Sequence, residues 1–290
     1  MHFRWNKQHL FVGLEAIFND EEKGVFENRA FKGTQFGQKS LALRLKGRYE
    51  VTDSIAPKVA ELLLEQGEYQ GFPEKENYLK LSLSYKQRIP YGIEGKHACY
   101  LRLFAGGFLA HSDRPFGAMP LLAAPGTTGD WWYDGMFLGR NQSPDVNGVL
   151  SQQVQPGQGG LRTPLPRVLG LGQSNNMLIA INLESDIPMQ FILKAPGIVR
   201  LRPYLDVAYC PSTQPTAAGL SPYYLSGGFS LQFFDRMFSL YCPVFSSENI
   251  SNAQKQNGMN YGQTIGFQLQ LQRLVPLLKG QNRVGELKYF

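Results

Sequence analysis

The side chains that could perform chemistry in this chain are few and widely separated. Its histidines and cysteines are His2, His9, His97, His111, Cys99, Cys210 and Cys242. The pair His97-x-Cys99 contains two residue types that bind zinc, but no third or fourth ligand stands at a usable spacing. We therefore expect no metal site, and we interpret His97 as a polar residue at a strand end.

Other patterns that could bind an ion or begin nucleophilic catalysis are incomplete. Asp145-x-Asn147-Gly148 resembles the start of a calcium loop, but the bidentate glutamate downstream is absent, and turn chemistry explains the pattern. Ser151 and Ser174 have no histidine partner for nucleophilic catalysis. The residues therefore predict no catalytic group, no cofactor and no enzyme activity.

Composition indicates a folded chain with many turns. Of the 290 residues, 43% are hydrophobic, 12% aromatic and only 18% charged, whereas disordered chains contain more charge and fewer aromatics. The net charge is +6, yet the densest basic group is only Arg44, Lys46 and Arg48. Because nucleic-acid sites combine a basic patch with interleaved aromatics, we expect no nucleic-acid partner.

The dominant pattern along the chain is an alternation of apolar and polar residues with a period of two, which is typical of β-strands. Leu41, Leu43 and Leu45 alternate with Arg44 and Lys46, for example. The same pattern recurs at 79–86, 177–184, 199–207 and 264–272, and further strands are expected at 8–18, 97–109 and 226–244. These segments predict eight strands, or ten if the last divides near Phe233-Phe234 and the tail Gly285–Phe290 also pairs.

Two segments do not follow this pattern. Asp53-Ser54 could cap a helix that continues through Val59 and Leu62 and ends at Gly67. The segment 110–174 is long, rich in glycine and proline, and aperiodic. A loop of that length in a compact domain is either functional or folded inward as a plug.

The alternation permits two environments for the apolar face. In a soluble β-sandwich the apolar faces pack together, whereas in a membrane barrel they face lipid and the polar residues line the interior. Strands longer than the roughly 9–11 residues that cross a bilayer favour the barrel. A terminal Tyr289-Phe290 and aromatics near strand ends, expected to form interface girdles, also favour it. These aromatics are Trp5, Tyr78, Tyr91, Tyr209, Tyr241 and Tyr261.

Two blocks carry a resemblance to a known family. The first comprises Tyr133-Asp134-x-x-Phe137-Leu138-Gly139-Arg140-Asn141, Gly148-Val149-Leu150-Ser151-Gln152-Gln153, Gly159-Gly160 and Gly172-Gln173-Ser174-Asn175-Asn176. The second comprises Phe238-Ser239-Leu240-Tyr241-Cys242-Pro243-Val244-Phe245-Ser246-Ser247 and Asn257-Gly258-x-x-Tyr261. Over residues 98–275 the chain resembles the C-terminal β-barrel region of aminopeptidase-N-like (gluzincin) zinc metallopeptidases of Bacteroidetes.

The chain departs from that family in its chemistry. The peptidases bind zinc through His-Glu-x-x-His on a helix, where a glutamate activates the metal-bound water. None of the four histidines of this chain lies three or four residues from another, and none is followed by glutamate. The resemblance therefore implies the barrel without the catalytic domain.

The first block contains our candidate functional residues, which form a loop or plug motif. They are Tyr133, Asp134, Phe137, Leu138, Gly139, Arg140, Gln152, Gln153 and Gly160. In a plug, Arg140 would need a carboxylate partner, because burying an unpaired charge is costly. The candidate partners are Asp134 and the strand residues Glu50, Glu184 and Asp206, while Gln152 and Gln153 would bond to strand side chains. The alternative is an external loop that packs on itself.

We therefore predict an all-β protein: one antiparallel transmembrane β-barrel over 1–290, with about 8–12 strands and the 110–174 loop or plug. The first residues contain no apolar signal region, so we expect either a mature segment or a chain that is not exported. The expected function is a bacterial outer-membrane anchor or docking scaffold with a largely filled interior. Its expected partners are the lipid bilayer and a peptidase domain or another envelope protein. The alternatives are a small-solute pore or transporter, and a soluble β-sandwich binding module.

The missing zinc motif leads to the first testable prediction. The purified chain should contain no stoichiometric zinc and should release no amino-terminal residues from peptide substrates. Metal analysis by mass spectrometry, together with a peptidase assay, checks both statements. One tightly bound zinc ion per chain would contradict this interpretation.

Overall fold

The structure is a computed structural model in which most of the chain is strand. It describes residues 1–5, 7–27, 30–53, 55–70, 75–92, 97–111, 120–124, 152–154, 157–166, 171–187, 199–212, 219–234 and 236–270. Within these ranges no helix is long and apolar enough to cross a membrane. The expected all-β class is confirmed.

Eleven strands form one sheet in the order β1-β2-β3-β4-β5-β6-β9-β10-β11-β12-β13, and every neighbouring pair is antiparallel. The first six strands are β1 (His2–Trp5), β2 (Gln8–Glu27), β3 (Ala30–Val51), β4 (Lys58–Gln70), β5 (Lys75–Tyr91) and β6 (His97–His111). The remaining five are β9 (Met177–Ser185), β10 (Val199–Tyr209), β11 (Tyr223–Phe233), β12 (Phe238–Ser246) and β13 (Gly266–Leu269). This number falls within the expected 8–12. Among the described residues, β1 and β13 form the two edges.

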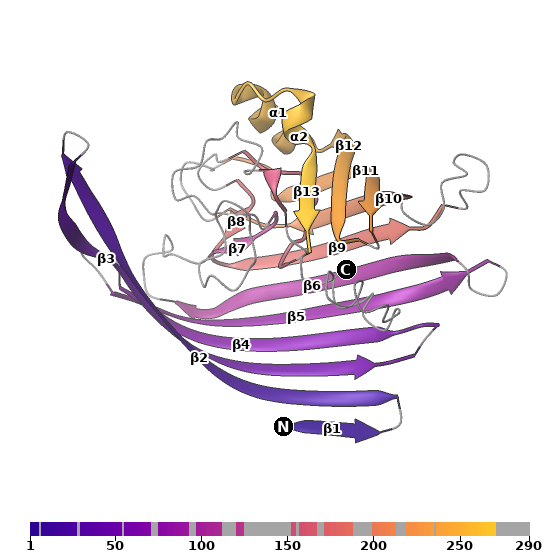
Figure 1. Cartoon of the computed structure of the whole chain (residues 1–290), viewed down its shortest axis with the longest axis horizontal. Coiled ribbons are helices and arrows are strands. Elements are labelled where there is room, and N and C mark those ends of the chain that lie inside the picture. The colour runs from indigo at the N-terminus through magenta and orange to yellow at the C-terminus, as the bar shows by residue number, and fades with distance from the viewer. Residues whose placement is uncertain are drawn as a thin grey trace.

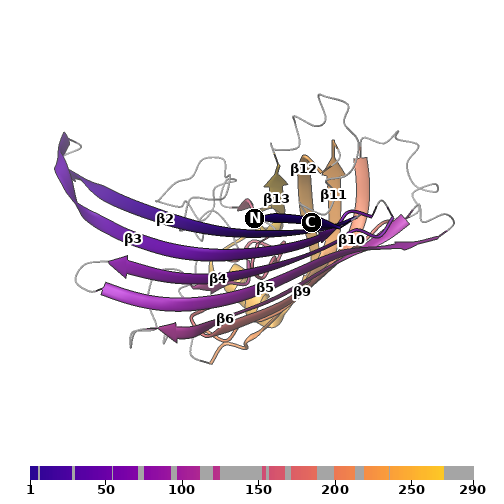
Figure 2. The ribbon, with the colours of Figure 1, turned by 90° about the horizontal axis from the view of Figure 1, so that it is seen from below.

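The sheet twists strongly along its length. Strands β11–β13 run across the direction of β2–β5 in both views (Figures 1 and 2). A small second sheet, formed by β7 (Leu121–Leu122) and β8 (Gln173–Ser174), and two helices, α1 (Glu248–Gln256) and α2 (Tyr261–Thr264), complete the described elements.

The helix expected at 53–67 is wrong, because these residues form most of β4. Leu62 lies opposite Leu83 of β5 and Gly47 of β3, so pairing on both sides satisfies the backbone and overrides local helix propensity. Gly67, expected to end the helix, instead lies under the Tyr78 ring, where an added Cβ would lie 2.1 Å from the ring.

Two other strand boundaries differ from expectation. The strand predicted at 8–18 extends to Glu27, while the one predicted at 264–272 begins at Gly266. The late start has a local cause: Asn260 and Gln263 form a capping box that begins the α2 helix. The segment 226–244 divides into β11 and β12 at a turn, as one part of the ten-strand alternative expected. In that turn Phe234 and Arg236 have positive φ. The other part of that alternative, pairing of the tail Gly285–Phe290, lies outside the described residues.

The two faces of the sheet are inverted relative to a soluble protein. Across β6, β9, β10 and β11, one row of neighbouring residues is apolar and exposed: Leu103, Ile181, Val207 and Leu225. One residue away on each strand, the other face carries a polar and buried row: Arg102, Asn182, Asp206 and Ser226. We call the first the outer face and the second the inner face.

The same inversion holds on the N-terminal strands. On the outer face, Leu62 and Leu83 lie opposite each other and are each 48% exposed. On the inner face, a row of alternating charge runs from Arg44 to Glu65 to Lys80 on β3, β4 and β5. The Arg44 Nε lies 2.6 Å, and the Lys80 Nζ 2.8 Å, from the Glu65 carboxylate, which is 1% exposed.

The expected aromatic girdle is only partly confirmed. Tyr78 and Tyr241 belong to the buried inner face, where their hydroxyls donate to Glu65 (2.9 Å) and Gln268 (2.7 Å). Tyr261 begins a helix instead of ending a strand. Tyr91 and Tyr209 do lie at strand ends, and Tyr91 is exposed. Hydrogen bonds to inner-face acceptors account for the difference, because a buried hydroxyl needs a partner.

In a barrel, the alternating run 264–272 is expected to turn its apolar residues, such as Phe267, to lipid and its glutamines to the interior. Gln268 and Gln270 are indeed buried, but Phe267 is only 9% exposed, so this expectation is partly wrong. The Phe267 carbonyl accepts a hydrogen bond from the Val154 N–H (2.8 Å), and Gln153 forms a parallel bridge with Phe267. Residues 153–154 therefore lie alongside this edge strand.

The charge row predicts that Glu65 supports the fold. Glu65→Gln removes the buried carboxylate that pairs with both Arg44 and Lys80 and should cost about 3–5 kcal/mol, because both buried cations lose this partner, although Arg44 keeps a longer ion pair with Glu15 at 3.7 Å. Equilibrium denaturant unfolding measures this cost. The matched control is Glu61→Gln on the same strand, whose carboxylate is partly exposed and pairs with Arg48, and it should cost no more than about 1 kcal/mol. Equal costs for the two variants would contradict the prediction.

Candidate functional site

Part of the long 110–174 region lies against the inner face of the sheet. The Gly159 and Leu161 N–H groups donate to the carbonyls of Leu122 and Ala123, at 2.9 Å each. Leu161 itself is fully buried in a core with Phe104, Leu178 and other apolar residues of the inner face. We call residues 157–166 the inner segment.

This core has a definite position on the inner face. It contains small and aromatic residues of β6, β9, β10 and β11 together with Ile250 and Ala253 of α1. Helix α1 thus covers one end of the inner face, where the residues are apolar. Further along the same strands the inner-face residues are charged, and the inner segment crosses from the apolar zone into the charged zone.

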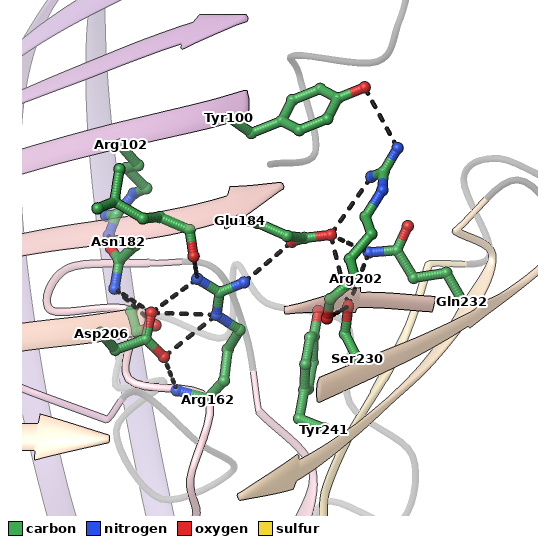
Figure 3. A network of polar contacts seen from close by, with 12 residues as sticks. Tyr100, Arg102, Arg162, Asn182, Glu184, Arg202, Asp206, Ser230, Gln232 and Tyr241 are labelled. Carbon is green, nitrogen blue, oxygen red and sulfur yellow. Dashed lines mark hydrogen bonds and ion pairs between the residues drawn. The ribbon is translucent and has the colours of Figure 1, made fainter. Parts of the chain in front are cut away.

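Arg162 is the centre of the charged zone (Figure 3). Its Nη2 donates to Asp206 Oδ1 at 2.7 Å, its Nη1 to Glu184 Oε2 at 2.9 Å, and its backbone N–H to Asp206 Oδ2 at 2.9 Å. The guanidinium also lies 4.7 Å from the Tyr204 ring centroid. Two carboxylates from adjacent strands therefore enclose one arginine of the inner segment.

The electrostatics of Arg162 follow from these contacts. Burial alone would lower the pKa of its guanidinium, but the nearby carboxylates of Asp206 and Glu184 outweigh that effect and raise the pKa. Arg162 therefore remains charged, and it neutralises carboxylates that would otherwise be buried without a partner.

A second arginine, Arg202, shares the Glu184 carboxylate with Arg162. Arg202, 1% exposed, donates from Nε to Asp186 at 2.6 Å and from Nη1 to Glu184 at 3.3 Å. Its guanidinium lies 4.6 Å from the Tyr100 ring centroid, and that of Arg236 lies 4.4 Å from the same centroid. Glu184 also accepts from Gln232 Nε2. Four strands and one turn thus contribute to a continuous polar network.

Asn182 and Gly160 join the inner segment to β6. The Asn182 amide donates to Asp206 (3.0 Å) and to the Gly160 carbonyl (3.1 Å), while its Oδ1 accepts from Arg102 (2.8 Å). Gly160 has a φ of +62°, and an added Cβ would lie 2.5 Å from the Arg102 Nη1 atom. Only glycine permits this close approach of the segment to the strand.

The predicted site residues are thus only partly described. Tyr133, Asp134, Phe137, Leu138, Gly139 and Arg140 lie outside the described residues, so their role in a plug stays a prediction. Gln153 and Gly160 lie on the inner side of the sheet, both buried, and Gln152 is half-buried.

Sequence reasoning missed Arg162. The wall acids Glu184 and Asp206 were expected to bind an arginine of the long segment, and they do bind one, but the arginine in the structure is Arg162. The sequence did contain a feature that could have pointed to Arg162, because it is the only basic residue between positions 141 and 166 and it closely follows Gly159-Gly160. The third expected acid, Glu50, pairs with its own strand neighbour Arg48 at 3.2 Å.

The chemistry available to this network is electrostatic and structural. Its carboxylates accept hydrogen bonds from arginines, and within the described ranges no group of three or more His, Cys, Asp or Glu residues is arranged to hold a metal ion. The network can hold the inner segment against the inner face of the sheet, which is the role expected of a plug contact.

Comparisons with known proteins add little to this geometry. No protein-family model matches the chain, and no curated protein matches it. Among solved structures, the chain is similar to BamA from Haemophilus ducreyi lacking POTRA domains 1–3, with a TM-score of 0.34 and 13% identity. The match covers 83% of this chain and 58% of that chain, so this chain spans a little over half of its length.

The network predicts a measurable role for Arg162. Arg162→Ala leaves Asp206 and Glu184 buried with one fewer cation and should destabilise the protein by about 3–5 kcal/mol. It should also expose the inner segment to limited proteolysis. Arg162→Lys keeps the charge but not the paired N–H geometry, so its effect should be intermediate. Proteolysis and stability unchanged in Arg162→Ala would contradict the tethering role.

Proposed function

We propose that this chain is a transmembrane β-barrel of the bacterial outer membrane. The inversion of the two faces of the sheet carries the proposal. Large apolar side chains such as Leu45, Leu62 and Leu83 are each almost half exposed, while Arg102, Arg202 and Asp206 are almost completely buried. Water would favour the opposite arrangement, whereas lipid outside and a polar interior favour this one.

The height of the apolar outer face supports the same proposal. On β3 it extends from Leu41 to Val51, although the strand has 22 residues. On β10 it extends from Leu201 to Tyr209, almost the whole of an 11-residue strand. At about 3.3 Å per step and a tilt of about 45°, the ten steps from Leu41 to Val51 span about 23 Å and the eight steps from Leu201 to Tyr209 span about 19 Å, near the ~25 Å apolar band of outer-membrane barrels. This apolar zone, the belt, therefore varies little in height although the strand lengths differ twofold.

The soluble β-sandwich is the weaker alternative. A sandwich would need a second sheet packed on the outer face, so that Leu103, Ile181 and Val207 were buried. These three residues instead form an exposed row across adjacent strands. Continuous exposed apolar surface of this kind marks an interface with lipid or protein.

We further propose that the barrel acts as an anchor or docking scaffold and has no catalytic activity of its own. The inner segment, tied by Arg162, occupies the interior between β6 and β11, which supports a largely filled barrel. Beyond the apolar belt, β2 and β3 continue as a two-stranded ribbon to Glu27 and Ala30, and this ribbon offers a surface for an envelope partner. The resemblance to the metallopeptidase barrels suggests a peptidase domain as that partner.

One observation favours the second candidate, a small-solute pore. A cavity of about 840 Å³ lies at β2–β4, and its lining includes Lys46, Arg48, Glu50 and Glu61. Charged residues of both signs around such a space are typical of an aqueous lumen. Single-channel conductance in planar bilayers separates the two candidates: the anchor predicts no stepwise current, and reproducible steps would favour the pore.

The lipid assignment is tested by a pair of adjacent residues on β4. In a background with the native cysteines replaced, spin labels are attached to Leu62→Cys and Glu61→Cys in reconstituted membranes. The label at 62 should be accessible to oxygen dissolved in lipid, and the label at 61 should not, because the two side chains lie on opposite faces. Greater oxygen accessibility at 61 would reject the membrane orientation.

A matched pair of charge substitutions tests the same assignment energetically. Leu45→Arg near the belt centre should cost about 2–4 kcal/mol in a bilayer. Lys46→Arg, on the other face of β3, should be nearly neutral. Unfolding in lipid vesicles measures both. A native chain that migrates equally with and without heating in a detergent gel would also contradict a barrel.

A further inference from the structure

Two buried cations on the inner face differ from all the others. Lys86 of β5 and Arg102 of β6 lie directly opposite each other, and they are 8% and 3% exposed. The other buried lysines and arginines of the described residues are Arg44, Lys80, Arg162, Arg202 and Arg236, and each has a carboxylate within 4 Å. Within the same ranges, neither Lys86 nor Arg102 forms an ion pair.

Among the described residues, Arg102 forms hydrogen bonds with neutral groups. Its Nη1 donates to Asn182 Oδ1 at 2.8 Å, its Nη2 donates to the Gln158 carbonyl at 2.6 Å, and its guanidinium lies 5.5 Å from the Phe104 ring centroid. Its buried Nε has no hydrogen-bond partner. The guanidinium is therefore held by two neutral acceptors, while its Nε–H has no acceptor.

The nearest carboxylates are already engaged with other cations. Glu61 of β4 lies opposite Ser84, two residues before Lys86, but it pairs with Arg48 at 3.0 Å. Asp206 lies two strands beyond Arg102, and its oxygens bind Arg162. The Asn182 amide separates Asp206 from Arg102. Among the described residues, two like charges therefore lie side by side with no carboxylate paired to either.

We propose that Lys86 and Arg102 form a binding site for one small oxyanion, such as a carboxylate or phosphate. Like charges directly opposite on adjacent strands repel, and a buried charge without a partner is costly. An oxyanion accepts several charge-assisted hydrogen bonds at once, so it can bridge the free Arg102 Nε–H and the Lys86 ammonium. The inference does not depend on the membrane assignment, because both residues lie on the enclosed face in either environment.

The binding test uses the full chain, purified in detergent, at constant ionic strength. Isothermal titration with inorganic phosphate and with acetate should show one site per chain, and whichever of the two binds more tightly identifies the preferred oxyanion. Lys86→Gln should weaken binding about tenfold or more. The matched control is Lys80→Gln on the same strand and face, which removes a cation already paired with Glu65 and should leave the affinity unchanged.

A second variant keeps the proposal testable if Lys86→Gln folds poorly. Lys86→Glu supplies a carboxylate opposite Arg102, so it should unfold at a higher temperature than the native chain in anion-free buffer and should not respond to phosphate. Three results would overturn the proposal. These are no binding to the native chain, equal loss of binding in Lys80→Gln, or chloride binding as tightly as either oxyanion.

Discussion

The contact on which the interior of this protein depends is the one between Arg162 and the carboxylates of Asp206 and Glu184. Each carboxylate belongs to a strand whose inner face is closed to solvent, and neither could remain charged there without a cation. The cation does not come from the sheet alone, because it arrives on a segment that crosses the inner face. The sheet and the inner segment are therefore mutually dependent: among the described residues, Asp206 forms its ion pair with Arg162, and Arg162 forms its ion pairs with the sheet carboxylates Asp206 and Glu184.

The same constraint explains why the inner face is organised in zones. Near α1 the side chains of β6, β9 and β10 are apolar, and the inner segment contributes Leu161 to their core. Further along, most of the buried charges pair with an opposite charge, as Arg202 does with Glu184 on the neighbouring strand and with Asp186 just beyond it. The neutral Asn182 fills the position between Arg102 and Asp206 with both a donor and an acceptor. A buried polar network of this kind is stable only when nearly all of its members are satisfied.

Much of the sheet could be read from the sequence, because alternation with a period of two reports directly which residues share a face. The runs around Leu41–Leu45 and Met177–Leu183 became β3 and β9 with the expected sidedness. The region 53–67 was misread because Val59, Leu62 and Leu63 also fit a helical spacing. Only pairing with residues of β3 and β5 beyond the local segment, such as Gly47 and Leu83 opposite Leu62, decides between the two. Arg162 was missed for a similar reason, since no local pattern shows that Gly160 lets the segment approach Arg102.

The sequence by itself determined the class of the fold and the existence of two chemically distinct faces, because strand period and residue type are local properties. It also placed Glu184 and Asp206 among the candidate partners for a buried arginine of the long segment, since a charged side chain on an enclosed face requires a partner. Which face is enclosed was decided only by the tertiary structure. That choice depends on the twist of eleven strands and on the inner segment, and therefore on contacts between residues separated by as many as about a hundred positions, as Arg202 and Tyr100 are.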